Sequence, residues 1–339
     1  MHWKRGALRA RIEARSSEVE IQSSRAPRGS PMPNPSKGRD GEPPRTVRDM
    51  LARGRDFLVR KDRQAARLEA ELLVAHVLGM GRLELFLALE RPVEPAEVDR
   101  ARGLFVRCGE GEPCAYITGK REFYGRDFQV EPGVLIPRPE TELLVDLACE
   151  HIRRARSVRE GEGESEGQPQ HGPRVSEFGT GSGCIAITLA LELKGARVRA
   201  SDVSPAALAI ARRNAERLGA RVEFLQGDGL DVLMRAGGAD LLCANPPYID
   251  PADGRGLDPQ VRAFEPQEAL FTPPGDPEFW IRSLIDERSR LVRPGGSLLV
   301  ELGFDQAPRV RRLLAERELE GRFHADLEGT LRILEVPLR

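Results

Sequence analysis

The chain has 339 residues, which is long for one domain and comfortable for two. Hydrophobic residues make up 40% of it and charged residues 31%, and the formal net charge is -1. A protein that grips nucleic acid over a wide surface usually carries a basic excess, so this balance, with aromatic residues at only 5%, disfavours a nucleic-acid partner.

The first 45 residues differ in composition from the rest of the chain. They hold ten Lys or Arg against five Asp or Glu, and a stretch rich in Pro, Gly and Ser runs from Ser23 to Pro44. Too few large apolar residues are present to offset the entropy lost on ordering. We therefore expect residues 1–45 to be a disordered basic tail.

Residues 46–112 are expected to form a small all-helical domain. Thr46 is a candidate N-cap for the first helix. Apolar residues recur at helical spacing over 64–79, and Gly79 and Gly81 then end that helix. Two further helices are predicted at 83–87 and 95–108.

The periodicity changes over residues 113–135. Polar and apolar residues alternate on both sides of Gly125, a pattern that is typical of a β-hairpin. We expect this hairpin to link the helical domain to the remainder of the chain.

Residues 136–339 are expected to form an α/β domain. A helix is predicted at 136–149, entered through Pro137-Arg138-Pro139, and an exposed loop at 156–172. Strands are then predicted at 174–178, 197–202, 222–226, 239–244 and 297–302, helices at 183–193, 205–218, 278–291 and 307–317, and a closing hairpin at 322–327 and 331–336. Such alternation indicates a mostly parallel sheet with helices on both faces and a ligand site at the carboxyl ends of the strands.

A glycine-rich run, Gly179-Thr180-Gly181-Ser182-Gly183, lies between the first predicted strand of this domain and the next helix. Glycines allow a tight turn and bring a ligand close to the main chain. Asp202 ends the following strand, where an acidic side chain can accept both hydroxyls of a ribose; the alternative is that it caps the next helix. These two features occur in dehydrogenases as well as in methyltransferases.

Gly227-Asp228-Gly229 follows the third predicted strand of the domain. The acidic side chain could reach the amino group of an adenine there. Gly229 stands where an apolar wall would flank the adenine ring.

The run Asn245-Pro246-Pro247-Tyr248 ends a buried strand and indicates the reaction class. Two prolines give up two backbone donors but leave rigidly aimed carbonyls. The Asn245 side-chain oxygen and the Pro246 carbonyl can accept both N–H bonds of a planar NH2 group, on which Tyr248 can stack. This arrangement favours electron density on the nitrogen and predicts methyl transfer by positioning rather than by a strong base.

At these residues the chain resembles the HemK/PrmC family, the release factor glutamine methyltransferases. The resemblance covers about 46–339 and rests on five runs: Phe123-Tyr124-Gly125, Val134 to Glu142, Gly179 to Gly183, Asn245 to Ile249, and Phe264-Glu265-Pro266. The run from Ile136 to Glu142 distinguishes this family from other methyltransferases with Asn-Pro-Pro-Tyr.

The resemblance implies a Rossmann-like methyltransferase domain that uses S-adenosylmethionine, preceded by a helical domain and a linking hairpin. It implies that Gly179 to Gly183, Asp202, Gly229 and Asn245 hold the cofactor. It also implies that Asn245, Pro246, Pro247 and Tyr248 hold the glutamine amide of the Gly-Gly-Gln loop of class 1 peptide chain release factors. The helical domain would hold part of the release factor, with Arg138 and Glu142 near the junction.

The chain departs from the family pattern at two cofactor positions. Glu177-Phe178 stands where the family usually has Asp-Leu, and Gly229 stands where it often has an aromatic residue. A glutamate keeps the charge but is one methylene longer, so its contact to the methionine amine is expected to shift.

Two other functions share these motifs. An adenine methyltransferase acting on DNA or RNA would use the same Asn-Pro-Pro-Tyr run. A flipped base normally needs a basic cleft or a target-recognition domain, and no basic stretch outside the tail at 1–45 supplies one. A release-factor-binding module without turnover would not need the intact glycine loop, Asp202 and Asn245.

Cysteine usage and hydropathy bear on where the chain acts. None of the five cysteines has metal-ligand spacing, which fits unpaired thiols in the cytoplasm and no metal site. No apolar run reaches the roughly 18 residues of a membrane span, so we expect no membrane segment. No coiled-coil pattern is visible, and a monomer is expected.

Overall fold

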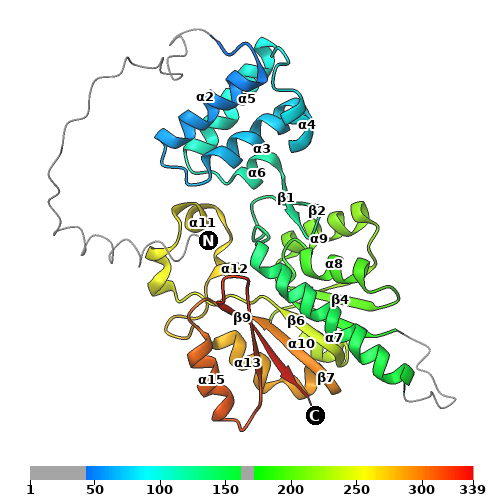
Figure 1. Cartoon of the computed structure of the whole chain (residues 1–339). Coiled ribbons are helices and arrows are strands. Elements are labelled where there is room, and N and C mark those ends of the chain that lie inside the picture. The colour runs from blue at the N-terminus through cyan, green and yellow to red at the C-terminus, as the bar shows by residue number, and fades with distance from the viewer. Residues whose placement is uncertain (1–42, 162–171, 339) are drawn as a thin grey trace, which may run out of the picture. The chain divides into compact units, whose positions relative to one another are not determined.

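The computed structural model describes residues 43–161 and 172–338, which divide into two compact units (Figure 1). The first unit runs to Cys114 and includes Leu257–Pro259, and the second comprises Ala115–Gly256 and Gln260–Arg339. The tail predicted at 1–45 lies almost wholly outside the described residues. Within the described ranges, no helix is long and apolar enough to cross a membrane.

The first unit is helical. Its helices are α2 (Val47–Arg60), α3 (Ala66–Leu78), α4 (Arg82–Leu87) and α5 (Pro95–Gly109). Thr46 caps α2 as predicted: its hydroxyl accepts from the Asp49 N–H at 3.2 Å, and the Asp49 carboxylate accepts from the Thr46 N–H. Buried Leu58, Leu73 and Phe105 supply apolar contacts between α2, α3 and α5.

A short antiparallel pair, β1 (Lys120–Phe123) and β2 (Arg126–Gln129), belongs to the second unit. Its two turn residues, Tyr124 and Gly125, have φ of 53° and 70°, as a type I′ turn requires. The hairpin predicted over residues 113–135 is wrong for the first residues of that segment. Cys114–Thr118 is helix α6, because Pro113 before it has the backbone angle of a first helical turn.

The second unit is built on a seven-stranded sheet, which confirms the predicted α/β class. Its strands are β3 (Arg174–Phe178), β4 (Arg197–Asp202), β5 (Val222–Gln226), β6 (Ala239–Ala244), β7 (Val292–Glu301), β8 (Arg322–Ala325) and β9 (Leu331–Pro337). They lie in the order β5-β4-β3-β6-β7-β9-β8, in which β9 is antiparallel to both of its neighbours and the other pairs are parallel. Strands β4 and β5 are added on one side of β3, and β6 and β7 on the other. The switch point between β3 and β6 is where ligands of such folds bind.

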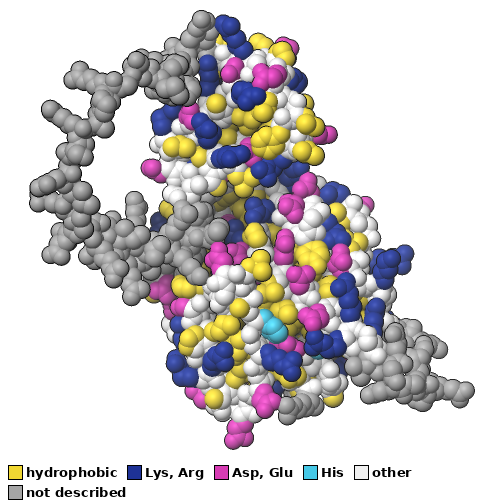
Figure 2. Space-filling view, in the orientation of Figure 1, with side chains coloured by type: hydrophobic (Ala, Val, Ile, Leu, Met, Phe, Trp, Pro, Cys, Tyr) yellow, Lys and Arg dark blue, Asp and Glu magenta, His cyan; other side chains and the backbone are white. Residues whose placement is uncertain are grey.

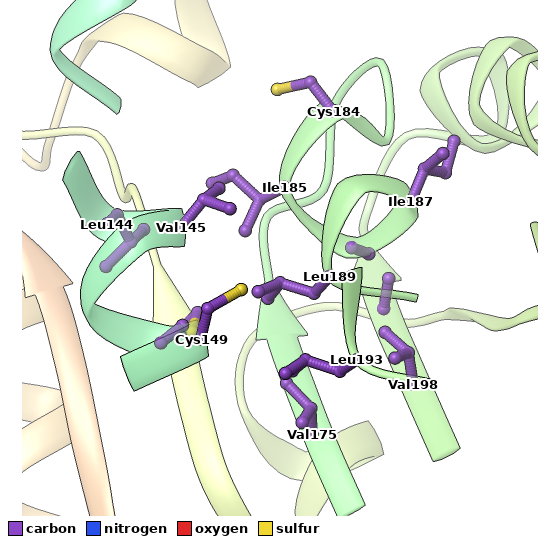
Figure 3. Packing of buried hydrophobic residues seen from close by; sticks show 14 of the residues in the cluster. Leu144, Val145, Cys149, Val175, Cys184, Ile185, Ile187, Leu189, Leu193 and Val198 are labelled. Atoms are coloured by element: carbon purple, nitrogen blue, oxygen red, sulfur yellow. The ribbon is translucent and has the colours of Figure 1, made fainter. Parts of the chain in front are cut away.

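Helices cover both faces of this sheet. One face carries α7 (Glu142–Gly161), α8 (Cys184–Glu192) and α9 (Pro205–Leu218), and the other carries α10 (Asp231–Arg235), α13 (Phe279–Asp286), α14 (Arg288–Leu291) and α15 (Ala307–Ala315). Alternate residues of a strand serve the two layers: Leu241 and Cys243 pack with α7 and α8, whereas Leu242 and Ala244 pack with α13 and α15. Figure 3 shows the first layer, where side chains from α7 and α8 point toward one another above β3.

The structure differs from prediction mainly near the prolines. The helix expected from Ile136 is a 3-10 turn, η1 (Pro139–Thr141), followed by α7, because the prolines at 137 and 139 hold the chain extended before it. Helix α7 runs to Gly161, so the loop expected at 156–172 is wrong over its first residues, and 162–171 lie outside the described residues. Short helices between β6 and α13 were not predicted: η2 (Pro251–Gly256), α11 (Pro259–Phe264) and α12 (Gln267–Leu270).

Two glycines of the helical unit allow a matched test of its packing. A β carbon added at Gly54 of α2 would lie 2.0 Å from Cζ of the buried Phe105 ring, whereas one added at exposed Gly103 of α5 would meet nothing within 4 Å. Gly54→Ala should therefore lower the unfolding free energy by about 1–3 kcal/mol through overpacking. Gly103→Ala should raise it by about 0.5–1 kcal/mol.

Amide hydrogen exchange of α2 and α5 in the full chain would measure both effects. Equal shifts of the same sign in the two variants would contradict the packing seen at Gly54.

Candidate active site

The candidate site lies where the central strands of the sheet end. Strand pairing sets Phe178 of β3 beside Ser201 of β4 and Ala244 of β6, and Ala244 beside Val300 of β7. The residues that follow these positions therefore come together at one edge of the sheet. They include the glycine loop, Asp202, Asn245 and Glu301.

Backbone hydrogen bonds fix the glycine loop to β4. The N–H groups of Gly179 and Thr180 both donate to the Ser201 carbonyl, at 3.0 and 2.9 Å, and the Gly181 N–H donates to Oδ2 of Asp202 at 2.8 Å. Gly183 has φ of 84° and a β carbon there would lie 2.7 Å from Cδ1 of Ile187, so only glycine fits. The loop is thus held in one conformation, with Gly179 exposed and Gly181 half-buried.

Asp202 is positioned as a hydrogen-bond acceptor and not as a helix cap. Ser204 is the N-cap of α9, since its hydroxyl accepts from the Ala207 N–H at 3.2 Å, and the capping alternative for Asp202 is therefore wrong. The Asp202 carboxylate accepts from Gly181 N–H and from Ser204 N–H at 2.9 Å, which leaves acceptor capacity on both oxygens. Burial raises the pKa of Asp202 despite these bonds.

Glu177, at the end of β3, holds a polar atom without a partner. Its Oε2 accepts from the Thr180 hydroxyl at 2.6 Å and from the Ala186 N–H at 3.0 Å. Its Oε1 is buried and has no hydrogen-bond partner in the part of the chain that the structure describes. Burial raises the pKa of Glu177 to about 7. An unpaired buried carboxylate oxygen is costly, and a cationic or N–H donor ligand would offset that cost.

The loop after β5 lies next to Asp202. The Gly227 N–H donates to the Asp202 carbonyl at 3.1 Å. Gly229 has φ of 65°, and a β carbon there would meet nothing within 4 Å, so this residue supplies no wall of its own. Asp228 is exposed beside it.

Asn245 is held by its amide nitrogen. Nδ2 donates to the hydroxyl oxygen of Thr141 in η1 at 3.2 Å, which leaves Oδ1 as the end of the amide available to a ligand. Pro246 is buried behind it, and Pro247 and Tyr248 are half-buried. The Tyr248 ring lies against Gly303, where a β carbon would come within 3.1 Å of Cδ2.

Thr141 and Glu301 were not identified from the sequence. Both side chains are buried, and the Thr141 hydroxyl oxygen accepts from Nδ2 of Asn245. Burial raises the pKa of Glu301 to about 7 and that of the Tyr248 hydroxyl to about 12, the latter with a contribution from Glu301. The available signal was an acidic residue directly after the apolar run Leu298-Leu299-Val300.

A third buried carboxylate joins two of the runs on which the family resemblance rests. Glu265 accepts from the Ile136 N–H at 3.1 Å and from the Arg138 guanidinium at 2.5 Å. These bonds fix the segment that leads into η1, and therefore Thr141. Glu142, the residue after η1, accepts from the Tyr124 N–H at 2.8 Å and so holds the turn of the β1–β2 pair.

Asn214 of α9 is another residue that the sequence did not reveal. Its Nδ2 donates to the carbonyls of Ser182 and Gln129, at 2.9 and 3.0 Å, and its Oδ1 accepts from the Gln129 N–H at 2.8 Å. The side chain is fully buried. It therefore connects the glycine loop to β2.

Comparison with known proteins gives family matches over both units. The model described as "PrmC N-terminal domain" matches residues 49–119, and the "Methyltransferase small domain" matches 166–257. The release factor glutamine methyltransferase of Nitratidesulfovibrio vulgaris is 41% identical over 262 residues, 76% of this chain and 82% of that protein. Those of Geobacter sulfurreducens and Chlorobaculum tepidum are 40% and 43% identical, over 78% and 76% of this chain and 87% and 85% of theirs.

Asn214→Ala tests the connection between the glycine loop and β2. The change leaves buried backbone groups of Gln129 and Ser182 without partners, which should destabilise the second unit by about 1–3 kcal/mol. Urea unfolding of the full chain, followed by hydrogen exchange of α8 and α9, would measure this loss. Glu216→Ala on the exposed face of the same helix is the control, and an equal effect in both variants would contradict the role of Asn214.

Proposed function

Because the chain belongs to the release factor glutamine methyltransferase family, we propose that it methylates the side-chain amide nitrogen of the glutamine in the Gly-Gly-Gln loop of class 1 release factors, with S-adenosylmethionine as the methyl donor. One observation carries this proposal. The Asn245 amide is anchored through Nδ2 on buried Thr141, so its oxygen is offered to an N–H donor next to the Pro246 carbonyl.

The residues around the glycine loop fit the proposed cofactor. The partnerless Oε1 of Glu177 suits the ammonium of the methionine part, and the acceptor capacity of Asp202 suits the ribose hydroxyls. Gly179 is exposed and Gly181 half-buried, which allows close approach to the main chain there, and Asp228 and Gly229 would border the adenine. When bound, the cofactor supplies an electrophilic methyl group on a sulfonium.

The protein's contribution to the chemistry is positioning. An amide nitrogen is a poor nucleophile because its lone pair is delocalised into the carbonyl. Acceptance of both N–H bonds by Asn245 Oδ1 and the Pro246 carbonyl favours the form with electron density on nitrogen, while Tyr248 stacks on the amide plane. Pro247 keeps the two acceptors rigid, and a strong base is not required.

The first unit is proposed to hold part of the release factor. Its α4 exposes Leu83 and Leu87, at 75% and 81% of their possible surface, and these apolar side chains are available to contact a protein substrate. Apolar side chains also lie among charged ones on the face of this unit drawn in Figure 2. We further propose that the chain acts as a monomer in the cytoplasm.

An adenine methyltransferase is the competing proposal, because an adenine amino group is planar and conjugated like an amide. Charge argues against it: the net charge is -1, and positive and negative side chains are interspersed over the face drawn in Figure 2. An inactive binding module would not need Glu177, Asp202 and Asn245 held as they are.

A transfer assay separates these functions. The full chain is incubated with labelled S-adenosylmethionine and, separately, with a release factor, the same factor with its loop glutamine changed to alanine, DNA and ribosomal RNA. We expect label on the unmodified release factor only. Label on nucleic acid and none on the release factor would contradict the proposal, and cofactor binding without any label would indicate an inactive module.

Asn245→Ala should lower turnover of release factor by about 100-fold or more, because it removes an oriented acceptor at the reacting nitrogen. Steady-state kinetics at saturating cofactor would measure the loss, with Glu216→Ala as an exposed control. A rate within a fewfold of wild type would refute the role of Asn245.

Cofactor affinity should depend on pH through Glu177. Its pKa is raised to about 7, so the carboxylate that attracts the ammonium is present above this pH and is lost as the pH falls through it. We expect the Kd for S-adenosylmethionine, measured by calorimetry, to rise below pH 7. Glu177→Gln should remove this dependence, and methylthioadenosine, which has no ammonium, should not show it; the same rise with methylthioadenosine would contradict the assignment.

A further inference from the structure

The Tyr248 ring, on which the substrate amide is proposed to stack, lies against a glycine. Gly303 is buried two residues after the end of β7, and a β carbon added to it would lie 3.1 Å from Cδ2 of Tyr248. Gly303 does not have a positive φ, so an alanine would not be strained by a left-handed backbone there. The glycine therefore matters for the space that it leaves to the ring, and its place limits where the ring can lie.

Gln306 holds Gly303 through both of its backbone groups. The Gly303 N–H donates to Oε1 of Gln306 at 2.8 Å, and the Gln306 N–H donates to the Gly303 carbonyl at 3.1 Å. Only 1% of Gln306 is exposed, so bulk water does not compete for these bonds. Because Gln306 is the N-cap of α15, these bonds fix Gly303 to the start of that helix.

The other end of the Gln306 amide reaches the segment before α13. Nε2 of Gln306 donates to the Pro277 carbonyl at 2.9 Å. Two residues before Pro277, the Gly275 N–H donates to Oδ2 of Asp250 at 2.8 Å. Asp250 lies two residues after Tyr248. A closed circuit of contacts therefore starts at Tyr248 and returns to it, and the Gln306 side chain joins its two halves.

The chemistry of both partners dictates the orientation of the Gln306 amide. The Gly303 N–H needs an acceptor, whereas the Pro277 carbonyl needs a donor, and a glutamine offers one of each at a fixed spacing. A carboxylate only accepts, and an apolar side chain of the same length does neither. Gln306 is thus suited to this position by its chemistry and not only by its size.

We propose that Gln306 is a positioning residue for the proposed methyl transfer. Together with Gly303 it forms what we call the Tyr248 support, which holds the aromatic ring at the place where it can stack on the substrate amide. Gln306 is buried and acts through Tyr248 rather than on the substrate. Stacking depends on how the two planes are placed, so a displaced ring lowers the rate. The inference rests on the proposed function.

The test compares kcat and KM for a release factor, and the Kd of S-adenosylmethionine, across variants of the full chain. Gln306→Met has nearly the same length and makes neither side-chain hydrogen bond. Gly303→Ala keeps Gln306 and its hydrogen-bonding groups and adds a methyl group against the ring. Each change should lower kcat by about tenfold, because it displaces the stacking ring, and should leave the Kd within about twofold. Wild-type kcat in both variants would overturn the proposal.

Leu314→Ala is the matched control for a loss of stability. Leu314 is buried on the same helix, roughly two turns from its start, and its truncation leaves a cavity in the core. This variant should unfold at a lower urea concentration and yet keep kcat within about twofold of wild type. A kcat that falls in step with stability in Leu314→Ala and Gln306→Met alike would assign Gln306 a merely structural role and overturn the proposal.

Fluorine NMR reports on the ring itself. The chain has three tyrosines, so labelling with 3-fluorotyrosine gives three signals, and Tyr248→Phe identifies the one from Tyr248. This signal should shift in Gln306→Met and in Gly303→Ala and stay in place in Leu314→Ala. If Gln306→Met does not fold, Gly303→Ala still tests the support. An unchanged Tyr248 signal in the folded variants would contradict the proposal.

A double variant tests whether Gln306 acts through Tyr248. Tyr248→Leu removes the ring, so adding Gln306→Met should lower kcat by no more than about twofold further. Losses that multiply in the double variant would show that Gln306 acts elsewhere. A wild-type chain that methylates no release factor would count against the proposed function instead. The fluorine signals would still test the Tyr248 support in that case, so the two failures are distinguishable.

Discussion

The pairing of β3 with β4 on one side and β6 on the other is the constraint on which the site depends. Parallel pairing aligns the strand ends, so Ser201, the residue before Asp202, can accept from two N–H groups of the glycine loop. The same pairing sets Phe178 beside Ala244, which delivers Asn245 to the edge that the loop occupies. A slip of one residue in either pair would exchange the faces of a strand and separate these groups.

Buried carboxylates organise the surroundings of this edge. Glu265 fixes the segment before η1 by two hydrogen bonds, and η1 in turn carries Thr141 to Asn245. Glu177 and Glu301, by contrast, each keep one oxygen without a partner among the described residues, and burial raises the pKa of both. Glu265 therefore builds the frame, whereas the unpartnered oxygen of Glu177 stands where charge matters for a ligand.

The sequence predicted the sheet well and the connections poorly. Strands such as 174–178 and 239–244 were found at their observed bounds, because short strands that alternate with helices and are bounded by turn signals leave little choice of conformation. The short helices between β6 and α13 and the break before α7 were missed, since prolines mark a change of direction without specifying which turn follows. Sequence alone identified the glycine loop, Asp202 and the run from Asn245 to Tyr248, because the residue types at these positions carry the chemistry. Thr141, Asn214 and Glu301 were not, because their roles arise from contacts between residues distant in sequence.

Membership of the family and the anchored amide of Asn245 both support methyl transfer to a release factor glutamine. Its most direct test is mass spectrometry of a release factor after incubation with the protein and S-adenosylmethionine. We expect one added methyl group on the glutamine of the Gly-Gly-Gln peptide and none elsewhere in the factor. An unmodified glutamine in the presence of wild-type protein with bound cofactor, or methyl groups on another residue, would contradict it.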